Sequence, residues 1–214
     1  MQLEEYKNKF SEDDSAGWDA IDQHLAQYYP GQSPQHFGTI IKYSMGGDEP
    51  LDGISIYECD TQQPHYHLVS YGLSELYYNE EASGGEYSKF GFELSFRVPK
   101  EDAGDLYWAM GLMQFYARYV FQSGKWFDPY HFAPANNPIN TDPACDVTGV
   151  AFVLDPVLGK INTPHGELQF LQMFGLTTAE LKKLFENPST AECQKLIEPI
   201  QQANPLLITD FSRK

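Results

Sequence analysis

The sequence contains few cysteines, and their positions do not suggest a set of disulfide bonds or a metal site. Cys59, Cys145 and Cys193 are far apart and odd in number, and no Cys-x-x-Cys pair occurs. Neither a set of disulfides nor a cysteine-based zinc site is therefore expected. A folded chain of 214 residues buries roughly 70% of the surface that its unfolded form exposes. A core of that size can be stable without either kind of cross-link.

Long hydrophobic runs are also missing. No stretch approaches the ~20 apolar residues that span a bilayer. Residues 1–14 are polar and acidic, without the basic start and apolar core of a signal peptide. Three free thiols, no export signal and no membrane anchor together predict a cytoplasmic protein that has no membrane contact.

Positive charge is scarce. Fourteen lysines and arginines face 30 aspartates and glutamates, which gives a formal net charge of −16. This charge repels phosphate backbones, so binding to nucleic acid is not expected. Basic residues interleaved with aromatics, which stack bases in single-strand binders, are missing as well. An acidic surface keeps a protein in solution, and it also speeds the encounter with a basic partner.

Catalytic motifs are few. The sequence has no Gly-x-Ser-x-Gly elbow, no phosphate-binding loop and no Gly-x-Gly-x-x-Gly. One pattern could still support catalysis, the pair His65 and His67. The two residues lie two apart on an expected strand, so their side chains point to the same face. With His131 or His165 as a third ligand they could form a catalytic zinc site. The alternative interpretation is two histidines that hydrogen-bond to their neighbours, with no metal and no cofactor.

Periodic patterns of apolar residues run along most of the chain. Alternation predicts strands at 54–59, 66–71 and 90–98. In the last of these, apolar residues share one face, and small or polar residues share the other. We expect the apolar face in the core and the polar face open to a partner. The polar set is Gly91, Glu93, Ser95 and Arg97.

Helical spacing and capping residues predict most of the other elements. A helix over 105–122 is apolar on most sides, which is typical of a central, buried helix. Capping-box patterns that start at Thr177 and Ser189 predict two helices near the C-terminus. Ser15 and Pro30 bound a further helix. Shorter strands are expected at 39–43, 150–154, 167–174 and 206–209, and a long irregular loop at 128–146.

The order of these elements predicts an α+β fold, a mixed and mostly antiparallel β-sheet flanked by helices. Residues 1–14 are expected to form a flexible acidic arm, and residues 15–214 a single domain. Several aromatic side chains lie in or near expected loops and strand ends. Such residues often anchor a protein partner, although they can also seal the edge of a core. They are Tyr71, Tyr77, Tyr78, Tyr87 and Trp126.

These same segments resemble the Suppressor of fused family. The resemblance runs from about Gly17 to the C-terminus and rests on several blocks in the right order. The blocks are WDAID (18–22), YSMGGDEPLDGISIY (43–57), PHYHLVSYGLSELY (64–77), FGFELSFR (90–97), ARYVFQS (117–123), TPHG (163–166) and LITD (207–210).

The resemblance implies a fold like the N-terminal domain of that family, and a function by protein binding without catalysis. Animal members sequester a transcription factor by adding its short peptide as a strand between two domains. The tyrosine that ends the Gly-Leu-Ser-acid-Leu-Tyr segment lies near that peptide, and Tyr77 occupies its place here. The partner-binding residues predicted for this chain are Tyr77, Tyr71, Asp52, Glu75, Glu86 and Trp126.

The matched region corresponds to the first domain of the family, so we expect the second half of the peptide clamp to be absent. Short single-domain members are of bacterial type, and that branch includes immunity proteins that neutralise toxins. The leading hypothesis is a non-catalytic immunity protein that binds a basic toxin. A general adaptor for a short peptide segment differs from it only in the partner. A metal-dependent hydrolase built on His65 and His67 is the hypothesis from another class.

Overall fold

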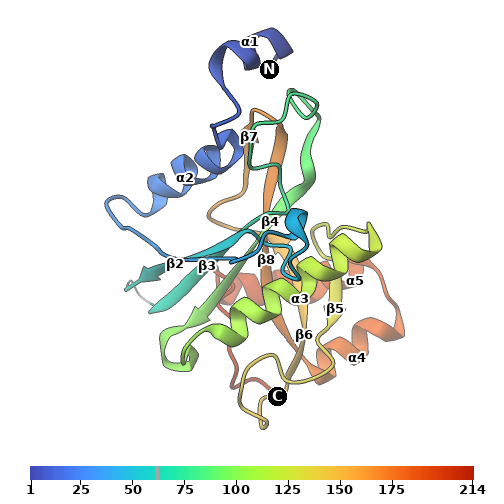
Figure 1. Ribbon diagram of the computed structural model, residues 1–214. Helices are drawn as coiled ribbons and strands as arrows, with labels where there is room; N and C mark the ends of the chain where they lie inside the picture. Colours follow the sequence, from blue (N-terminus) through green and yellow to red (C-terminus); the bar gives the residue numbers. More distant parts are fainter. Residues whose placement is uncertain (61–62) are drawn as a thin grey trace.

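The computed structural model describes residues 1–60 and 63–214, which build a β-sheet with helices on both faces (Figure 1). Its strands are β1 (Gln35–Gly38), β2 (Gly53–Cys59), β3 (His65–Tyr71), β4 (Tyr87–Pro99), β5 (Phe132–Pro134), β6 (Val147–Leu154), β7 (Lys160–Thr163) and β8 (Gly166–Thr177). Its α-helices are α1 (Leu3–Lys9), α2 (Ala16–Tyr28), α3 (Tyr107–Ser123), α4 (Thr178–Glu186) and α5 (Thr190–Ala203). Two short 3-10 helices are η1 (Tyr43–Met45) and η2 (Lys100–Asp102).

The sheet has the strand order β1-β2-β3-β4-β8-β6-β5, and β7 pairs with β8 beside this path. Neighbouring strands are antiparallel except β4 and β8, which are parallel. The predicted α+β class and the mixed, mostly antiparallel sheet are confirmed.

The three strands predicted from alternation lie side by side as β2, β3 and β4. Their register places Leu68 opposite Phe96 and Tyr66 opposite Val98. The even-numbered apolar residues, among them Ile54, Leu68 and Phe96, belong to one hydrophobic cluster with α3. Side chains two apart on a strand share a face, so this alternation assigns one side of the sheet to α3.

Helix α3 begins and ends within two residues of its predicted bounds, but it is not a central helix. It crosses one face of the sheet, in front of β8 and β6 in Figure 1. Tyr107, Phe115 and Tyr119 are 63%, 40% and 44% exposed. Because these positions are separated by multiples of four, they form a stripe on the outer side of the helix. Aromatic content alone therefore overstated its burial.

The opposite face of the sheet carries two apolar clusters, one under α2 and one under α4 and α5. Ile21 of α2 packs in the first cluster and Ile197 of α5 in the second. The polar residues of β4 lie on this face, and Glu93, Ser95 and Arg97 are at most 1% exposed. The expectation that this polar face is open to a partner is wrong, because these side chains are completely covered.

Several short elements differ from the sequence prediction. Residues 39–43 are not a strand: β1 lies just before them, and Ile40 is fully exposed. Residues 206–209 are not a strand either, although Leu207 and Thr209 are completely buried. The backbone N–H of Thr209 instead donates to the carbonyl of Arg97 at 3.2 Å. Strands β5 and β7 were not predicted, because three or four residues carry too little pattern.

Both predicted helix starts near the C-terminus are confirmed, but only the first has a complete capping box. Thr177 and Glu180 form a complete capping box at the start of α4, since each side chain accepts from the other's backbone N–H. At the start of α5, the Ser189 hydroxyl accepts from the backbone N–H of Glu192. The strands expected at 150–154 and 167–174 are also present, as parts of β6 and β8.

The N-terminal segment is more ordered than a flexible arm. Residues 3–9 form α1, and Tyr6 is completely buried against the rest of the protein. The segment is therefore held in place at Tyr6. Throughout residues 1–60 and 63–214, none of the helices has the length and apolarity needed to cross a membrane.

Candidate functional site

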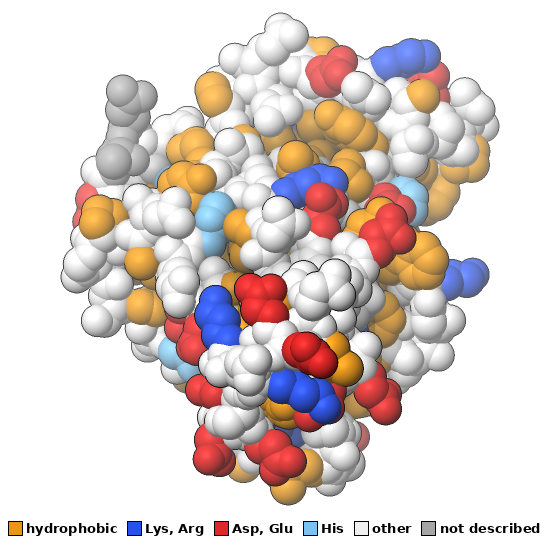
Figure 2. All heavy atoms as spheres, turned by 90° about the horizontal axis from the view of Figure 1, so that it is seen from above, with side chains coloured by type: hydrophobic (Ala, Val, Ile, Leu, Met, Phe, Trp, Pro, Cys, Tyr) orange, Lys and Arg blue, Asp and Glu red, His pale blue; other side chains and the backbone are white. Residues whose placement is uncertain are grey.

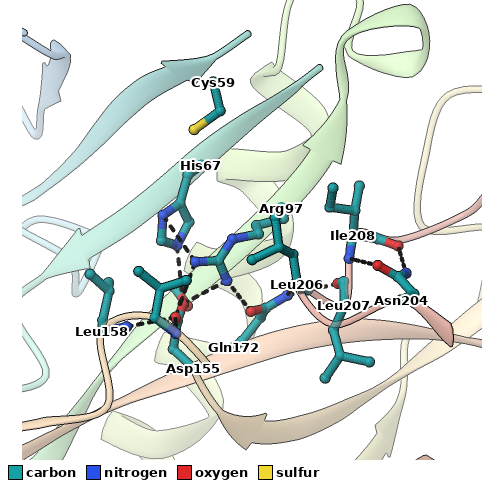
Figure 3. Close-up of polar contacts among 12 residues, drawn as sticks. Cys59, His67, Arg97, Asp155, Leu158, Gln172, Asn204, Leu206, Leu207 and Ile208 are labelled. Atoms are coloured by element: carbon teal, nitrogen blue, oxygen red, sulfur yellow. Dashed lines mark hydrogen bonds and ion pairs between the residues drawn. The ribbon is translucent and has the colours of Figure 1, made fainter. Parts of the chain in front are cut away.

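Ser95 and Arg97 of the covered face belong to a buried network centred on Asp155 (Figure 3). Arg97 contacts both oxygens of the Asp155 carboxylate, with Nη1 2.9 Å from Oδ2 and Nη2 3.1 Å from Oδ1. Ser95 Oγ donates to Oδ2 at 2.6 Å, and His67 Nε2 lies 3.1 Å from the same oxygen. The side chains of Arg97, Asp155 and His67 are at most 1% exposed. The two opposite charges thus compensate each other in the interior, where an unpaired charge is very costly.

This network joins elements that are distant in the sequence. Gln172 of β8 accepts from Arg97 through Oε1. Its Nε2 donates to two carbonyl oxygens in the segment after α5, at 2.9 and 2.7 Å. On the other side, the hydroxyl of Tyr29 lies 2.5 Å from Nδ1 of His67. The network therefore ties the end of α2 to the sheet and to the segment that follows α5.

The protonation states of the network fit a structural role. Burial lowers the pKa of His67 to about 4, so its ring is neutral at pH 7, with Nε2–H donating to Asp155 and Nδ1 accepting from Tyr29. Burial raises the pKa of Tyr29 and of Cys59, whose Sγ lies 3.9 Å from the Tyr29 hydroxyl. The order of acid, histidine and hydroxyl resembles a nucleophilic triad. Burial favours the protonated forms of the Cys59 thiol and the Tyr29 hydroxyl.

The geometry of His65 and His67 does not support the alternative hypothesis of a zinc site. Both ring nitrogens of His67 are engaged by Tyr29 and Asp155, and Nδ1 of His65 is hydrogen-bonded to the carbonyl of Gln63 at 2.7 Å. The proposed third ligands, His131 and His165, each bond to other groups. No group of three or more potential ligands is gathered anywhere in the described part of the chain. This pair matches the interpretation of histidines that bond to their neighbours.

A second polar cluster is open to solvent and contains Tyr77. It is a pocket of about 270 Å³, which we call the Tyr77 pocket. It is lined by Tyr43, Ser44, Pro50, Asp52, Gly72, Ser74, Glu75, Leu76, Tyr77, Lys89 and Phe121. Three of the six predicted partner-binding residues, Tyr77, Asp52 and Glu75, therefore meet in one place.

The side chain of Tyr77 is fixed although it is only half-buried. Its hydroxyl donates to Asp52 Oδ2 at 2.7 Å, and burial and this bond raise its pKa. Lys42 Nζ lies 3.7 Å from the centre of the Tyr77 ring, which is a cation–π contact. A partner that approaches this ring meets an aromatic surface whose orientation is already set.

The turn that leads into Tyr77 is held by a buried carboxylate. Glu93 Oε1 accepts from the backbone N–H groups of Gly72 and Ser74, both at 2.9 Å, and from Ser74 Oγ at 2.6 Å. Its Oε2 accepts from Ser70 Oγ at 2.6 Å. Lys89 Nζ donates to the carbonyl of Gly72 at 2.7 Å. The turn at residues 72–74 is therefore held by hydrogen bonds to two side chains, those of Glu93 and Lys89.

The other three predicted residues lie elsewhere. Tyr71 is completely buried; its ring stacks on Trp18 at 4.4 Å and its hydroxyl donates to Asp22. Tyr71 thus belongs to the core under α2, because its position on β3 points it to that face. Glu86 is exposed, and Trp126 is 57% exposed beyond the end of α3. Neither of these two lines the Tyr77 pocket.

Several residues of this site were not singled out from the sequence. Lys89 and Phe121 line the pocket and Lys42 contacts the Tyr77 ring, but none of the three was predicted to bind a partner, because only the fold brings them to Tyr77. Glu93 did carry a signal, because an acidic residue within an alternating strand must either face solvent or be compensated in the interior. On the face drawn in Figure 2, acidic and basic side chains lie among hydrophobic patches and are not segregated.

The sequence model of the Suppressor of fused protein (SUFU) family matches residues 47–214. The chain belongs to the Suppressor of fused family. The Suppressor of fused homologs of Homo sapiens and Mus musculus are each 33% identical to it over 210 residues. These alignments cover 92% of this chain and 43% of each relative. The chain therefore spans less than half the length of the curated relatives it matches.

Solved structures agree with this assignment. A chain of the Sufu–Fu complex has a TM-score of 0.80 and 30% identity, covering 94% of this chain and 92% of that one. Drosophila Suppressor of Fused gives the same TM-score and identity, over 95% of this chain and 52% of that one. A SUFU homolog from Neisseria gonorrhoeae FA 1090 has a TM-score of 0.61 at 12% identity, and the alignment covers 92% of this chain and 95% of the homolog. This last likeness concerns the fold alone.

Proposed function

We propose that this chain is a non-catalytic binding domain whose protein partner docks at the Tyr77 pocket. The observation that carries the proposal is a half-buried tyrosine ring that lines a surface pocket, is held in one orientation by Asp52 and Lys42, and follows a turn held by Glu93. Rigid aromatic side chains in a preformed pocket bind with little loss of conformational entropy. One similar structure is itself that of a complex, the Sufu–Fu complex, which supports a function by binding.

The charge of the chain supports a basic partner. The net charge is −16; the pocket itself is lined by two acidic residues, Asp52 and Glu75, and one basic residue, Lys89, so the support comes from the charge of the chain as a whole. Opposite charge on a partner speeds association and favours a matching orientation. We further propose that the chain acts as an immunity protein and that the basic partner is a toxin. A general adaptor for a short peptide segment would use the same pocket with a different occupant.

The docking proposal can be tested by recovering the partner from the native cell lysate with tagged chain. Tyr77→Ala is compared with wild type and with Tyr107→Ala, a control residue that is 63% exposed and outside the pocket. A contact residue of hot-spot size contributes about 2 kcal/mol or more, so Tyr77→Ala should lower affinity roughly 30-fold. The control should bind like wild type. Equal retention by all three proteins would exclude the Tyr77 pocket as the docking site.

The immunity proposal needs a separate test on the recovered protein. It should be basic, and its retention should fall as salt rises from about 0.05 to 0.5 M, because salt screens exposed charges. If it is a toxin, adding the purified chain should abolish its activity at a one-to-one ratio. A partner whose activity is unchanged in the complex would support the adaptor instead.

A further inference from the structure

The N-terminal segment packs directly against the loop that carries Tyr77. Tyr6 of α1 is completely buried, and its ring stacks on Tyr78 with the centroids 5.2 Å apart. Lys7 forms an ion pair with Glu80 at 2.5 Å, although both side chains are more than 40% exposed. The buried tyrosine is therefore the main anchor of this contact.

Tyr6 and His165 together bridge the two ends of the segment from Glu75 to Asn79. The backbone N–H of Asn79 donates to the Tyr6 hydroxyl at 2.9 Å, and that hydroxyl lies 2.8 Å from His165 Nε2. His165 Nδ1 lies 3.0 Å from the carbonyl of Glu75. In a neutral ring with Nδ1 protonated, every group in this chain of bonds has the partner it needs. We call this arrangement the Tyr6 latch.

The backbone inside the latch is held as well. The N–H of Tyr78 donates to the carbonyl of Asp14 at 3.1 Å, and the N–H of Gly17 donates to the carbonyl of Leu76 at 3.0 Å. A Cβ at Gly17 would lie 1.9 Å from the carbonyl oxygen of Glu75, so a side chain cannot fit there. The residues on both sides of Tyr77 thus bond to Asp14 and to Gly17 at the start of α2, while the Tyr77 side chain lines its pocket.

We propose that Tyr6 and His165 are positioning residues that hold Glu75–Asn79 in the conformation presenting Tyr77 to the partner. Glu75 and Tyr77 line the pocket, and the latch fixes the ends of the segment that contains both. This inference rests on the proposed function of the Tyr77 pocket. It assigns to α1 a role in recognition, although α1 itself does not line the pocket.

The holding part of the proposal is tested by residue-level amide hydrogen exchange of the full chain. Tyr6→Phe keeps the ring and removes only the hydroxyl that bonds to Asn79 and His165. Exchange of the Asn79 amide should accelerate about tenfold, the effect of losing one hydrogen bond in a partly buried site, while amides in β3 and β4 keep their rates. Tyr28→Phe, on the 42% exposed Tyr28 of α2, is the control and should change nothing.

His165 provides a rescue experiment. His165→Ala should accelerate the same amides, whereas His165→Gln should restore slow exchange, because an amide can donate to Glu75 and accept from Tyr6. Unchanged exchange at 75–79 in both Tyr6→Phe and His165→Ala would overturn the latch. So would an equal acceleration throughout the sheet, since that result indicates global destabilisation.

The presenting part is tested with the protein recovered by the wild-type chain in the lysate experiment. Tyr6→Phe should bind it roughly fivefold more weakly, the effect of about one hydrogen bond, and His165→Gln should bind like wild type. If Tyr77→Ala weakens binding and the Tyr6 and His165 variants do not, the latch proposal fails and the proposed function stands. If Tyr77→Ala has no effect, both proposals fail.

Discussion

The network around Asp155 and the Tyr77 pocket are both polar clusters, but they differ in their access to water. In the network around Asp155, the side chains of Arg97 and His67 are at most 1% exposed and each has a fixed partner. In the Tyr77 pocket, Tyr77 and Asp52 bond to each other at 2.7 Å but remain only half-buried. Hydrogen-bonded polar side chains are thus inaccessible to water in the network and partly accessible in the pocket.

This difference separates residues that hold the fold from residues that can recognise a partner. A buried polar group that loses its partner keeps its full desolvation penalty. A half-exposed group that loses its partner can bond to water. Substitutions in the network should therefore act mainly on the free energy of unfolding, and substitutions in the pocket mainly on binding.

The largest effect is expected from Arg97→Met. This change leaves the carboxylate of Asp155 buried without its main counter-charge, and breaking a buried pair in this way costs about 3–5 kcal/mol. Urea unfolding at pH 7 measures the loss. The matched control is Arg118→Met, because Arg118 forms a partly exposed ion pair with Glu49 at 2.9 Å, and such pairs contribute about 0–1 kcal/mol. Similar losses in both variants would contradict the contrast between closed and open sites.

A second effect concerns pH. The pKa of His67 is about 4 in the folded protein, against roughly 6.5 in an unfolded chain. The unfolded state therefore binds more protons between these values, so stability should fall as the pH drops from about 6.5 to about 4. The loss from this group is at most ~3 kcal/mol. It is measured as the free energy of unfolding across that range.

His67→Gln isolates the contribution of this group. The pKa values of His36, His65 and His165 are also lowered by burial, and these residues produce a slope of the same sign in both proteins. The variant should therefore lose less stability than wild type on acidification. Parallel curves for the two proteins would show that His67 is not kept neutral by the fold.

A third effect links the interior to the pocket. Glu93→Ala removes the acceptor for the backbone N–H groups of Gly72 and Ser74, which should cost about 2 kcal/mol. Glu93→Gln keeps one oxygen in place and should cost less. Partner affinity should fall in the alanine variant, because the turn before Tyr77 is released. Undiminished affinity in that variant would mean that the turn needs no support from Glu93.

Local pattern was sufficient for much of the fold. Alternation located β2, β3 and β4, and the capping box at Thr177 located the start of α4. The order of the strands and the cover over the polar face could not be derived in this way. Arg97 and Asp155 are 58 residues apart, so the sequence shows the polarity of each without showing that they neutralise each other.

The candidate site was found only in part, for the same reason. Tyr77, Asp52 and Glu75 came from the family resemblance, and they meet in one pocket. Tyr71 was grouped with Tyr77 because both tyrosines lie in or near expected loops and strand ends. Their environments differ because Tyr71 lies on β3 facing α2, whereas Tyr77 lies after the strand has ended. Only the fold distinguishes a core tyrosine from one that lines a surface pocket.

The smallest effect provides the most direct comparison, because one chemical change can be made in both clusters. Tyr29→Phe removes the hydroxyl that bonds to Nδ1 of His67, whose side chain is completely buried, and should cost about 1–3 kcal/mol. Tyr77→Phe removes the hydroxyl that bonds to Asp52, which water can replace, and should cost less than about 1 kcal/mol. Urea unfolding and partner retention are measured on both variants. Tyr29→Phe should change stability while binding is kept, and Tyr77→Phe should weaken binding while stability is kept. Equal losses of stability would mean that access to water does not separate the two clusters, and the division between holding the fold and recognising a partner would have to be abandoned.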